Sequence, residues 1–329
     1  MKIYVVVLNW NRSDDTIKCV KSVMALRITS YELNILIVDN GSSDDSIRIV
    51  RNFQFPMVRQ ALRPRAQGRV AHHPEQSRGI SNFQLIKNKK NLGFAGGNNV
   101  GIKCALDNSA DYVLILNNDT IVDKNLIESL LETAKKYPRA GAISPKIYFA
   151  KDYEFHKDRY EKSELGKVIW YAGGGIDWKN VYGLARGVDE VDRGQYDKLS
   201  ETDFATGTCM LISRKALEKV GLFDEKYFMY YEDTDLSVRV NKAGFKVFYA
   251  PSATVWHKVA QSSGIGSDLN DYFITRNRLL FGFRYASIRS RLAIVRESIK
   301  LLVLGRKWQK KGVVDFYFGK FGQGSWPNG

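Results

Sequence analysis

Short apolar runs and amphipathic stretches alternate along the first 140 residues of the chain. The apolar runs, typical of buried strands, are residues 3–8, 33–38, 83–86 and 112–116. The stretches between them that predict helices are residues 13–24, 43–51, 91–106 and 123–136. Strands that alternate with helices in this way indicate an α/β sheet with crossover helices.

The second half of the chain is less regular. We expect strands there at residues 142–149, 168–172, 209–213 and 246–249, and helices at residues 214–220 and 233–243. Residues 56–81 show no periodicity and contain Pro56, Pro64 and Pro74, so the sequence predicts a long loop or insertion there, and assigns it no role.

The composition is that of a folded chain with an uneven charge distribution. The 329 residues are 44% hydrophobic and 12% aromatic, enough for one large or two modest domains, and the net charge is +15. Residues 56–90 hold eight basic residues and one acid, and residues 276–320 hold twelve basic residues and two acids. The rest is close to neutral and has no nucleic-acid-binding motif, so we expect no nucleic-acid partner.

One apolar helical face lies inside the basic C-terminal segment. Ile288, Leu292, Val295, Ile299 and Leu302 recur at spacings of four and three residues, and basic residues flank them. Such a basic amphipathic helix suits the surface of an anionic membrane. A helix packed on the main domain with a solvated basic rim explains the pattern equally well.

Few features of the sequence bear on its compartment. The three cysteines are scattered and form no CxxC pair, which favours a reducing environment. The chain opens directly on a strand-like run rather than on a signal peptide, and no apolar run approaches the ~20 residues of a bilayer span. We therefore expect a cytoplasmic protein that attaches peripherally to the inner face of the membrane.

Polar residues follow three of the predicted strands, at the edge where open α/β sheets bind ligands. They are Asn9, Asp39 and the run 117–119. An acid after the second strand also occurs in dinucleotide-binding folds, but the glycine-rich turn that those folds require after the first strand is missing here. The glycine-rich turn at 93–97 lacks the Lys-Ser/Thr of a Walker loop, so its glycines serve close backbone approach at a helix N-terminus.

Five motifs follow one another along the chain. They are Val5-Val6-Val7-Leu8-Asn9-Trp10-Asn11, Val38-Asp39-Asn40-Gly41-Ser42-Ser43-Asp44, Asn91-Leu92-Gly93-Phe94-Ala95-Gly96-Gly97-Asn98, Leu116-Asn117-Asn118-Asp119 and Tyr231-Glu232-Asp233-Thr234-Asp235. In this order they resemble family 2 glycosyltransferases, and more narrowly their rhamnosyltransferase and galactofuranosyltransferase-like branch. The resemblance covers residues 1 to about 260, and the basic tail is also similar to that of these enzymes.

The resemblance implies a GT-A-type nucleotide-diphospho-sugar transferase fold, with a mostly parallel central sheet flanked by helices. It divides the chain into a glycosyltransferase domain (1–265) and a basic amphipathic C-terminal extension (266–329). Within the domain, residues 1–140 form the nucleotide-binding half and residues 141–265 the acceptor-binding half.

The family's DxD metal motif falls on Asn117-Asn118-Asp119, where the first position is Asn instead of Asp. The resemblance makes Asp119 a ligand of a divalent cation, Mg²⁺ or Mn²⁺, and His257 a further ligand. Such a cation would neutralise the charge of a departing diphosphate. The alternatives are ordinary turn chemistry for the asparagines and a structural role for His257.

The acceptor hydroxyl must lose a proton as it attacks the sugar, which requires a carboxylate base. Asp233 matches the family's base position at the start of a helix, and Glu232 binds acceptor or positions the base. The alternative is that these acids merely enrich a first helical turn. Direct displacement by the activated hydroxyl predicts inversion at the anomeric carbon.

The resemblance also assigns substrate contacts. Asp39 accepts the ring N3–H of a uracil or thymine, and Asn9 and Asn11 lie beside it; a turn at a strand end is the structural alternative. The residues expected to bind the nucleotide sugar are Asn9, Asn11, Asp39, Gly93, Phe94, Ala95, Asn98, Asn117 and Asn118. Those expected to contact the acceptor are Trp178, Gly207 and Thr208.

Together these features predict an inverting, metal-dependent glycosyltransferase. The family tendency is transfer of rhamnose from dTDP-rhamnose to a glycan or lipid-linked glycan, with UDP-galactofuranose or another UDP-sugar as the alternative donor. A nucleotidyltransferase would need a glycine-rich loop with Lys or Arg after the first strand, which is absent. A non-catalytic glycan-binding relative remains a further alternative.

Overall fold

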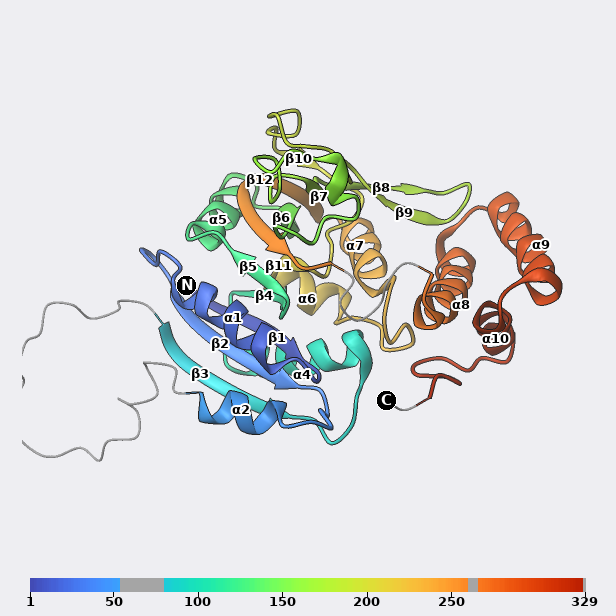
Figure 1. The fold of residues 1–329 in the computed structure, drawn as a ribbon, viewed down its shortest axis with the longest axis horizontal. Helices are drawn as coiled ribbons and strands as arrows, with labels where there is room; N and C mark the ends of the chain where they lie inside the picture. Colours follow the sequence, from blue (N-terminus) through green and yellow to red (C-terminus); the bar gives the residue numbers. More distant parts are fainter. Residues whose placement is uncertain (54–79, 260–265, 328–329) are drawn as a thin grey trace, which may run out of the picture.

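One sheet occupies the centre of the protein, in a computed structural model that describes residues 1–53, 80–259 and 266–327 (Figure 1). Its strands are β1 (Lys2–Asn9), β2 (Glu32–Asp39), β3 (Ile80–Lys87), β4 (Tyr112–Asn117), β5 (Thr120–Val122), β6 (Ala140–Phe149), β7 (Ile169–Tyr171), β10 (Ser200–Glu201), β11 (Cys209–Ser213) and β12 (Lys246–His257). The order across the sheet is β10-β12-β6-β11-β4-β1-β2-β3, with β5 beside β12 and β7 beside β6.

The first four strands, β1 to β4, are parallel to one another. β1 pairs in parallel with β2 and β4, and β2 pairs in parallel with β3. β11 is antiparallel to β4 and β6, whereas β12 is parallel to β6. The α/β fold with a largely parallel central sheet is therefore confirmed. In this register Asn9 lies opposite Asp39 and Leu8 opposite Asn117, so the polar strand ends meet at one edge, as predicted.

Helices cover both faces of the sheet, because alternate residues of each strand point to opposite sides. Val5 of β1 shares a core with α1 and α5, whereas Val6 shares a second core with α4, α6 and α7. The helices are α1 (Ser13–Met24), α2 (Ser46–Asn52), α4 (Gly93–Asp107), α5 (Leu126–Lys136), α6 (Arg214–Val220) and α7 (Glu232–Lys242).

Helix α4 lies unusually close to the sheet because glycines face it. A Cβ at Gly101 would lie 2.4 Å from a methyl of Val6, and one at Gly97 would lie 2.6 Å from a methyl of Leu8. A larger residue at either position would push the helix away from the sheet. This close packing fixes the start of α4, at Gly93, beside the carboxyl edge of the sheet.

Most predicted elements are present, and the differences have local causes. α1, α6 and β11 have the predicted bounds, whereas α2 and α5 begin three residues later than predicted. β12 was predicted to end at residue 249 but continues to His257, because a register shift between Ala250 and Thr254 interrupts its apolar pattern. Of the predicted insertion 56–81, residues 56–79 lie outside the described residues and residues 80–81 belong to β3.

The C-terminal segment forms three helices beside a small hairpin (Figure 1). The hairpin strands are β8 (Gly174–Asp177) and β9 (Tyr182–Ala185), and the helices are α8 (Asp268–Tyr285), α9 (Ile288–Leu304) and α10 (Lys307–Tyr317). α8 is largely buried, whereas α9 buries only Ser290, Ile294 and Ser298. Within the described ranges no helix has the length and apolarity to span a bilayer. The boundaries predicted at 140 and 265 stay predictions.

Candidate active site

Asp39 lies at the end of β2 and is almost completely buried. Its carboxylate accepts hydrogen bonds from the Asn9 amide (2.9 Å), the Ser42 hydroxyl (2.6 Å) and the Ser42 backbone N–H (3.1 Å). Because an ionised carboxylate offers about four acceptor positions, it retains capacity for one further donor. The neighbouring Ser42 was not singled out from the sequence.

Asn9 contacts this carboxylate directly, whereas Asn11 contacts the neighbouring serines Ser42 and Ser43. The Asn9 amide donates to Asp39 and accepts from the Thr16 hydroxyl (2.7 Å), so protein groups occupy both its donor and its acceptor. Asn11 has a φ of 53°, and its side-chain oxygen accepts from the Ser43 backbone N–H (2.9 Å). The geometry gives Asn9 the task of orienting Asp39 and gives Asn11 that of shaping the adjoining turn.

The glycine-rich segment 93–97 forms the first turn of α4 and is anchored from two sides. Gly93 has a φ of +72°, and a Cβ there would lie 2.4 Å from the carbonyl oxygen of Phe228. The same carbonyl accepts from the Ala95 N–H at 3.1 Å. On the other side, the Asn40 amide donates to the Gly93 carbonyl (3.0 Å), a contact that the sequence analysis missed although Asn40 lies in a quoted motif.

Two further residues of this segment support it from within. Asn98 is completely buried, and its amide donates to the Phe94 carbonyl at 2.9 Å, while its side-chain oxygen has no hydrogen-bond partner within the described ranges. The Phe94 ring lies edge-on to Phe223, at a centroid distance of 6.0 Å. Asn98 thus lies beneath the turn and holds it, instead of lying at its surface.

Asp119 and His257 come together from β4–β5 and from the end of β12, 138 residues later in the chain. His257 Nε2 lies 3.1 Å from Asp119 Oδ1, and both side chains are largely buried. Asp119 Oδ1 and His257 Nδ1 have no hydrogen-bond partner among the described residues. Ligands bound at about 2.1 Å to one octahedral cation lie about 3 Å apart, so Asp119 Oδ1 and His257 Nε2 fit a shared cation.

The two asparagines before Asp119 have different partners. The Asn118 amide donates to the Thr16 hydroxyl at 2.9 Å, and the Asn117 backbone N–H donates to the Thr208 carbonyl, also at 2.9 Å. In the described part of the chain, no group of three or more His, Cys, Asp or Glu is arranged so that it could hold a metal ion. A cation at Asp119 and His257 would therefore need further ligands from a substrate or from water.

Asp233 lies in the first turn of α7. Its carboxylate accepts from the backbone N–H groups of Gly207 (2.9 Å) and Thr234 (2.6 Å). Burial raises the pKa of Asp233, although these hydrogen bonds oppose the shift. Burial and the neighbouring Asp233 charge raise the pKa of Glu232 well above its ordinary value, and its Oε2 has no partner among the described residues.

The start of β11 connects the two carboxylate regions. Gly207 donates its N–H to Asp233, and the next residue, Thr208, accepts from Asn117, two residues before Asp119. A Cβ at Gly207 would lie 2.8 Å from the Phe94 ring. The structure thus brings the residues predicted for the base, the cation and the glycine-rich turn to one place.

Trp178 is the predicted site residue that lies apart from this group. It follows β8, and its ring stacks on Phe281 of α8 at 5.8 Å with an interplanar angle of 13°. One face of the indole is therefore covered by protein, while the side chain remains partly exposed. Its predicted contact with the acceptor stays a prediction.

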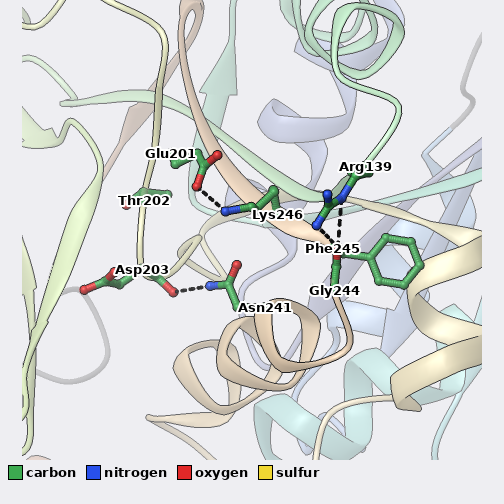
Figure 2. Close-up of a pocket in the computed structure, with 8 residues that line it drawn as sticks. All are labelled: Arg139, Glu201, Thr202, Asp203, Asn241, Gly244, Phe245 and Lys246. Carbon is green, nitrogen blue, oxygen red and sulfur yellow. Dashed lines mark hydrogen bonds and ion pairs between the residues drawn. The ribbon is translucent and has the colours of Figure 1, made fainter.

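A pocket of about 440 Å³ opens at the opposite end of the sheet, where β6 and β12 begin (Figure 2). Its charged side chains already have partners: Arg139 donates to the Gly244 carbonyl (2.9 Å), and Lys246 pairs with Glu201 (2.7 Å). Since His257 closes the far end of β12, this pocket is separate from the candidate active site.

A family model described as "Glycosyltransferase like family 2" matches residues 1–282 of the chain. The N-acetylglucosaminyl-diphospho-decaprenol L-rhamnosyltransferase of Mycobacterium tuberculosis is 29% identical over 245 residues, which cover 72% of this chain and 70% of that protein. The low-salt glycan biosynthesis hexosyltransferase Agl10 of Haloferax volcanii is 26% identical over 200 residues, covering 60% of this chain and 59% of that protein.

Solved structures share the fold at low sequence identity. The crystal structure of Staphylococcus aureus TarS has a TM-score of 0.51 and 12% identity, and the match covers 93% of this chain and 44% of TarS. The structure of GalNAc-T7 with UDP, GalNAc and Mn²⁺ has a TM-score of 0.55 and 14% identity, covering 100% of this chain and 58% of that one. Both support the predicted GT-A architecture.

Proposed function

Because the chain belongs to family 2 of the glycosyltransferases and is a glycosyltransferase, we propose that it transfers a sugar with inversion and that Asp233 is its base. The observation that carries this proposal is the placement of the Asp233 carboxylate. The backbone N–H groups of Gly207 and Thr234 donate to this carboxylate and fix its direction. The carbonyl of Thr208, next to Gly207, accepts from the Asn117 N–H, which joins this region to the strand end that carries Asp119.

This placement supports a single-displacement mechanism. A carboxylate with a raised pKa is a stronger base, so it takes the proton of an acceptor hydroxyl more readily near neutral pH. The hydroxyl oxygen then bonds to the anomeric carbon while the bond to the diphosphate breaks. Attack from the face opposite the leaving group inverts the configuration. Glu232, buried behind Asp233, positions the base in this proposal.

Asp119 and His257 would hold a divalent cation, Mg²⁺ or Mn²⁺. Asp119 Oδ1 has no hydrogen-bond partner among the described residues, and it lies 3.1 Å from His257 Nε2; both observations support this assignment. The cation would supply positive charge to the leaving diphosphate. With one carboxylate and one imidazole as protein ligands, the site carries less negative charge than a DxD pair, so cation affinity depends on the diphosphate of the donor.

We propose dTDP-rhamnose as the donor, and a UDP-sugar such as UDP-galactofuranose as the second candidate. The remaining acceptor capacity of Asp39 suits the ring N3–H that thymine and uracil share and that cytosine lacks. The name of the mycobacterial relative supports rhamnose and a lipid-linked acceptor glycan.

The test is a transfer assay that follows nucleotide release from dTDP-rhamnose and from UDP-galactofuranose with Mn²⁺, with the anomeric configuration of the product read by NMR. Asp233→Asn should lower kcat by about 100-fold or more. Asp268→Asn is the matched control, because Asp268 lies exposed in the first turn of α8. Retention of configuration, or a normal rate in Asp233→Asn, would contradict the assignment.

We further propose that α9 contacts an anionic membrane. Of its predicted apolar face, Ile288, Leu292, Ile299 and Leu302 are exposed, which supports contact with a surface outside the chain. Ile288 is 76% exposed and Leu304 at the end of the helix is 73% exposed. Large exposed apolar patches mark interaction surfaces.

The charge of this face supports an anionic lipid surface as its partner. Arg289, Arg296 and Lys300 of α9 are all exposed, and Lys307 follows at the start of α10. Each basic residue near an anionic lipid surface contributes about 1 kcal/mol, and the apolar side chains insert between the headgroups. A lipid surface meets both requirements at once, and it would bring the enzyme to a lipid-linked acceptor.

Flotation of the full chain with vesicles tests this contact. The protein should float with vesicles that contain phosphatidylglycerol and less with phosphatidylcholine alone. Leu292→Glu combined with Val303→Glu should abolish flotation. Leu184→Glu is the matched control, because Leu184 is 56% exposed but lies on β9. Equal flotation of the double variant and the control would reject the contact.

A further inference from the structure

The loop at residues 227–231 has a strained backbone directly before the proposed base. Phe228, Tyr230 and Tyr231 have φ values of 65°, 67° and 72°, a region that non-glycine residues rarely adopt. None of the three is the Asn or Asp that best tolerates it. Such a conformation persists only where surrounding groups hold it.

This loop joins two parts of the candidate active site. On one side the Phe228 carbonyl accepts from the Ala95 N–H, and the Phe228 ring fills the space beside Gly93. On the other side Tyr231 is the N-cap of α7, so the loop sets where this helix begins, and with it the position of Asp233 in the first turn. A displacement of the loop would therefore move the base relative to the glycine-rich turn.

Two buried polar side chains of α8 hold the loop. The Asn277 amide nitrogen lies within hydrogen-bond distance of three loop carbonyls, those of Tyr227 (2.9 Å), Met229 (2.7 Å) and Tyr230 (2.9 Å). Arg276 donates to the Tyr227 carbonyl at 3.0 Å, and its Nε donates to the Asn277 side-chain oxygen at 3.0 Å. Both residues are completely buried.

We propose that Asn277, oriented by Arg276, is a positioning residue for glycosyl transfer, because it holds the strained 227–231 loop and thereby places Asp233. This inference rests on the proposed role of Asp233. The contacts go to backbone carbonyls, so they fix the path of the loop whatever side chains it carries. They also come from α8, which joins the C-terminal helices to the catalytic part of the chain.

The first experiment measures amide hydrogen exchange in the loop. In Asn277→Ser, amide hydrogen exchange in peptides that cover residues 224–236 should accelerate at least tenfold, because the shorter side chain cannot reach the three carbonyls. Ile294→Ala is the matched control: Ile294 is buried where α9 packs on α8, against Gly282, and its side chain has no group that could donate to the loop carbonyls. This control should lower the melting temperature without accelerating exchange in the loop.

The second experiment measures turnover of dTDP-rhamnose with Mn²⁺ below the melting temperature of each variant. Asn277→Ser should lower kcat at least tenfold and change the donor KM less than threefold. Glycine at position 230 removes one strained residue, so the same substitution in a Tyr230→Gly background should lower kcat less than threefold. A smaller loss of kcat in the Tyr230→Gly background indicates that Asn277 acts on kcat by holding the loop, whereas a general loss of stability would lower kcat in both backgrounds.

Each outcome has a defined meaning. Normal kcat and normal exchange in Asn277→Ser overturn the inference, as does a loss of kcat that Tyr230→Gly does not reduce. If neither Asn277→Ser variant folds, the contacts are folding determinants, and the positioning role is also overturned. If Asp233→Asn remains active, the proposal that Asp233 is the base is wrong. Faster exchange in Asn277→Ser would still show that Asn277 holds the loop, because that measurement does not depend on which residue is the base.

Discussion

Asp235 is the buried charge that ties α7 to α8, and its removal is the prediction that the structure specifies most closely. The side chain is completely buried and accepts four hydrogen bonds. They come from the hydroxyls of Tyr227 (3.2 Å) and Tyr285 (2.8 Å) and from the guanidinium groups of Arg284 (3.1 Å) and Arg239 (2.7 Å). Asp235→Asn keeps the volume but removes the negative charge between two arginines.

The expected loss of stability follows from the partners that remain. Removing one member of a buried ion pair costs about 3–5 kcal/mol. Arg284 keeps Asp224 at 2.6 Å, and Arg239 keeps the carbonyls of Val220 and Leu222, so we expect the lower end of the range, about 3 kcal/mol. For a chain of this size that corresponds to a melting temperature lower by roughly 6 °C.

Thermal unfolding followed by circular dichroism measures this change. Asp45→Asn is the control, because Asp45 also pairs with an arginine, Arg48 at 2.6 Å, but both side chains are exposed. Its melting temperature should not change measurably. A melting temperature for Asp235→Asn within 2 °C of the wild-type value would refute the reasoning that this carboxylate compensates two arginines.

Three further predictions concern the active site. Gly93→Ala should destabilise the protein more than Gly244→Ala. Both glycines have positive φ, but only at Gly93 would a Cβ press against a loop carbonyl. Melting temperatures that fall equally in the two variants would contradict the steric argument. Because burial raises the pKa of Asp233 and the proposed base acts only when ionised, log kcat should rise with pH through that raised pKa and then level off, whereas a rise centred at or below the ordinary aspartate pKa of ~3.9 would contradict the argument. The raised pKa of Glu232 means that the folded state retains a proton which the unfolded chain releases above pH ~4.3, so wild-type stability should fall as pH rises from there through the raised pKa. Melting temperatures of Glu232→Gln across the same pH range should lack that decline, and an identical decline in both proteins would refute it.

The sequence predicts what depends on local pattern. The parallel strands, the helices between them and the meeting of Asn9 with Asp39 follow from periodicity and from the rule that strand ends share an edge. Asp119 meets His257 because β12 continues beyond a register shift to His257. The shift interrupts the apolar pattern of β12, so the sequence underestimated the length of this strand.

Contacts over long sequence distances could not be predicted in this way. Asn277 reaches carbonyls 47–50 residues earlier in the chain, and no local pattern in α8 distinguishes an amide that bonds backbone from one that faces solvent. Periodicity also identified the apolar face of α9, but it did not show whether protein or solvent lies against it. That answer required knowing that Ile294 and Ser298 face inward.

The burial of α8 has a practical consequence for anyone who shortens this enzyme. A truncation placed before Asp268 to obtain a version that no longer associates with lipid would also remove the partners of Asp235 and of the loop carbonyls. Such a protein would lose activity for reasons unrelated to lipid. Attachment and turnover can therefore be separated by point changes on the outer side of α9, whereas deleting the tail would confound them.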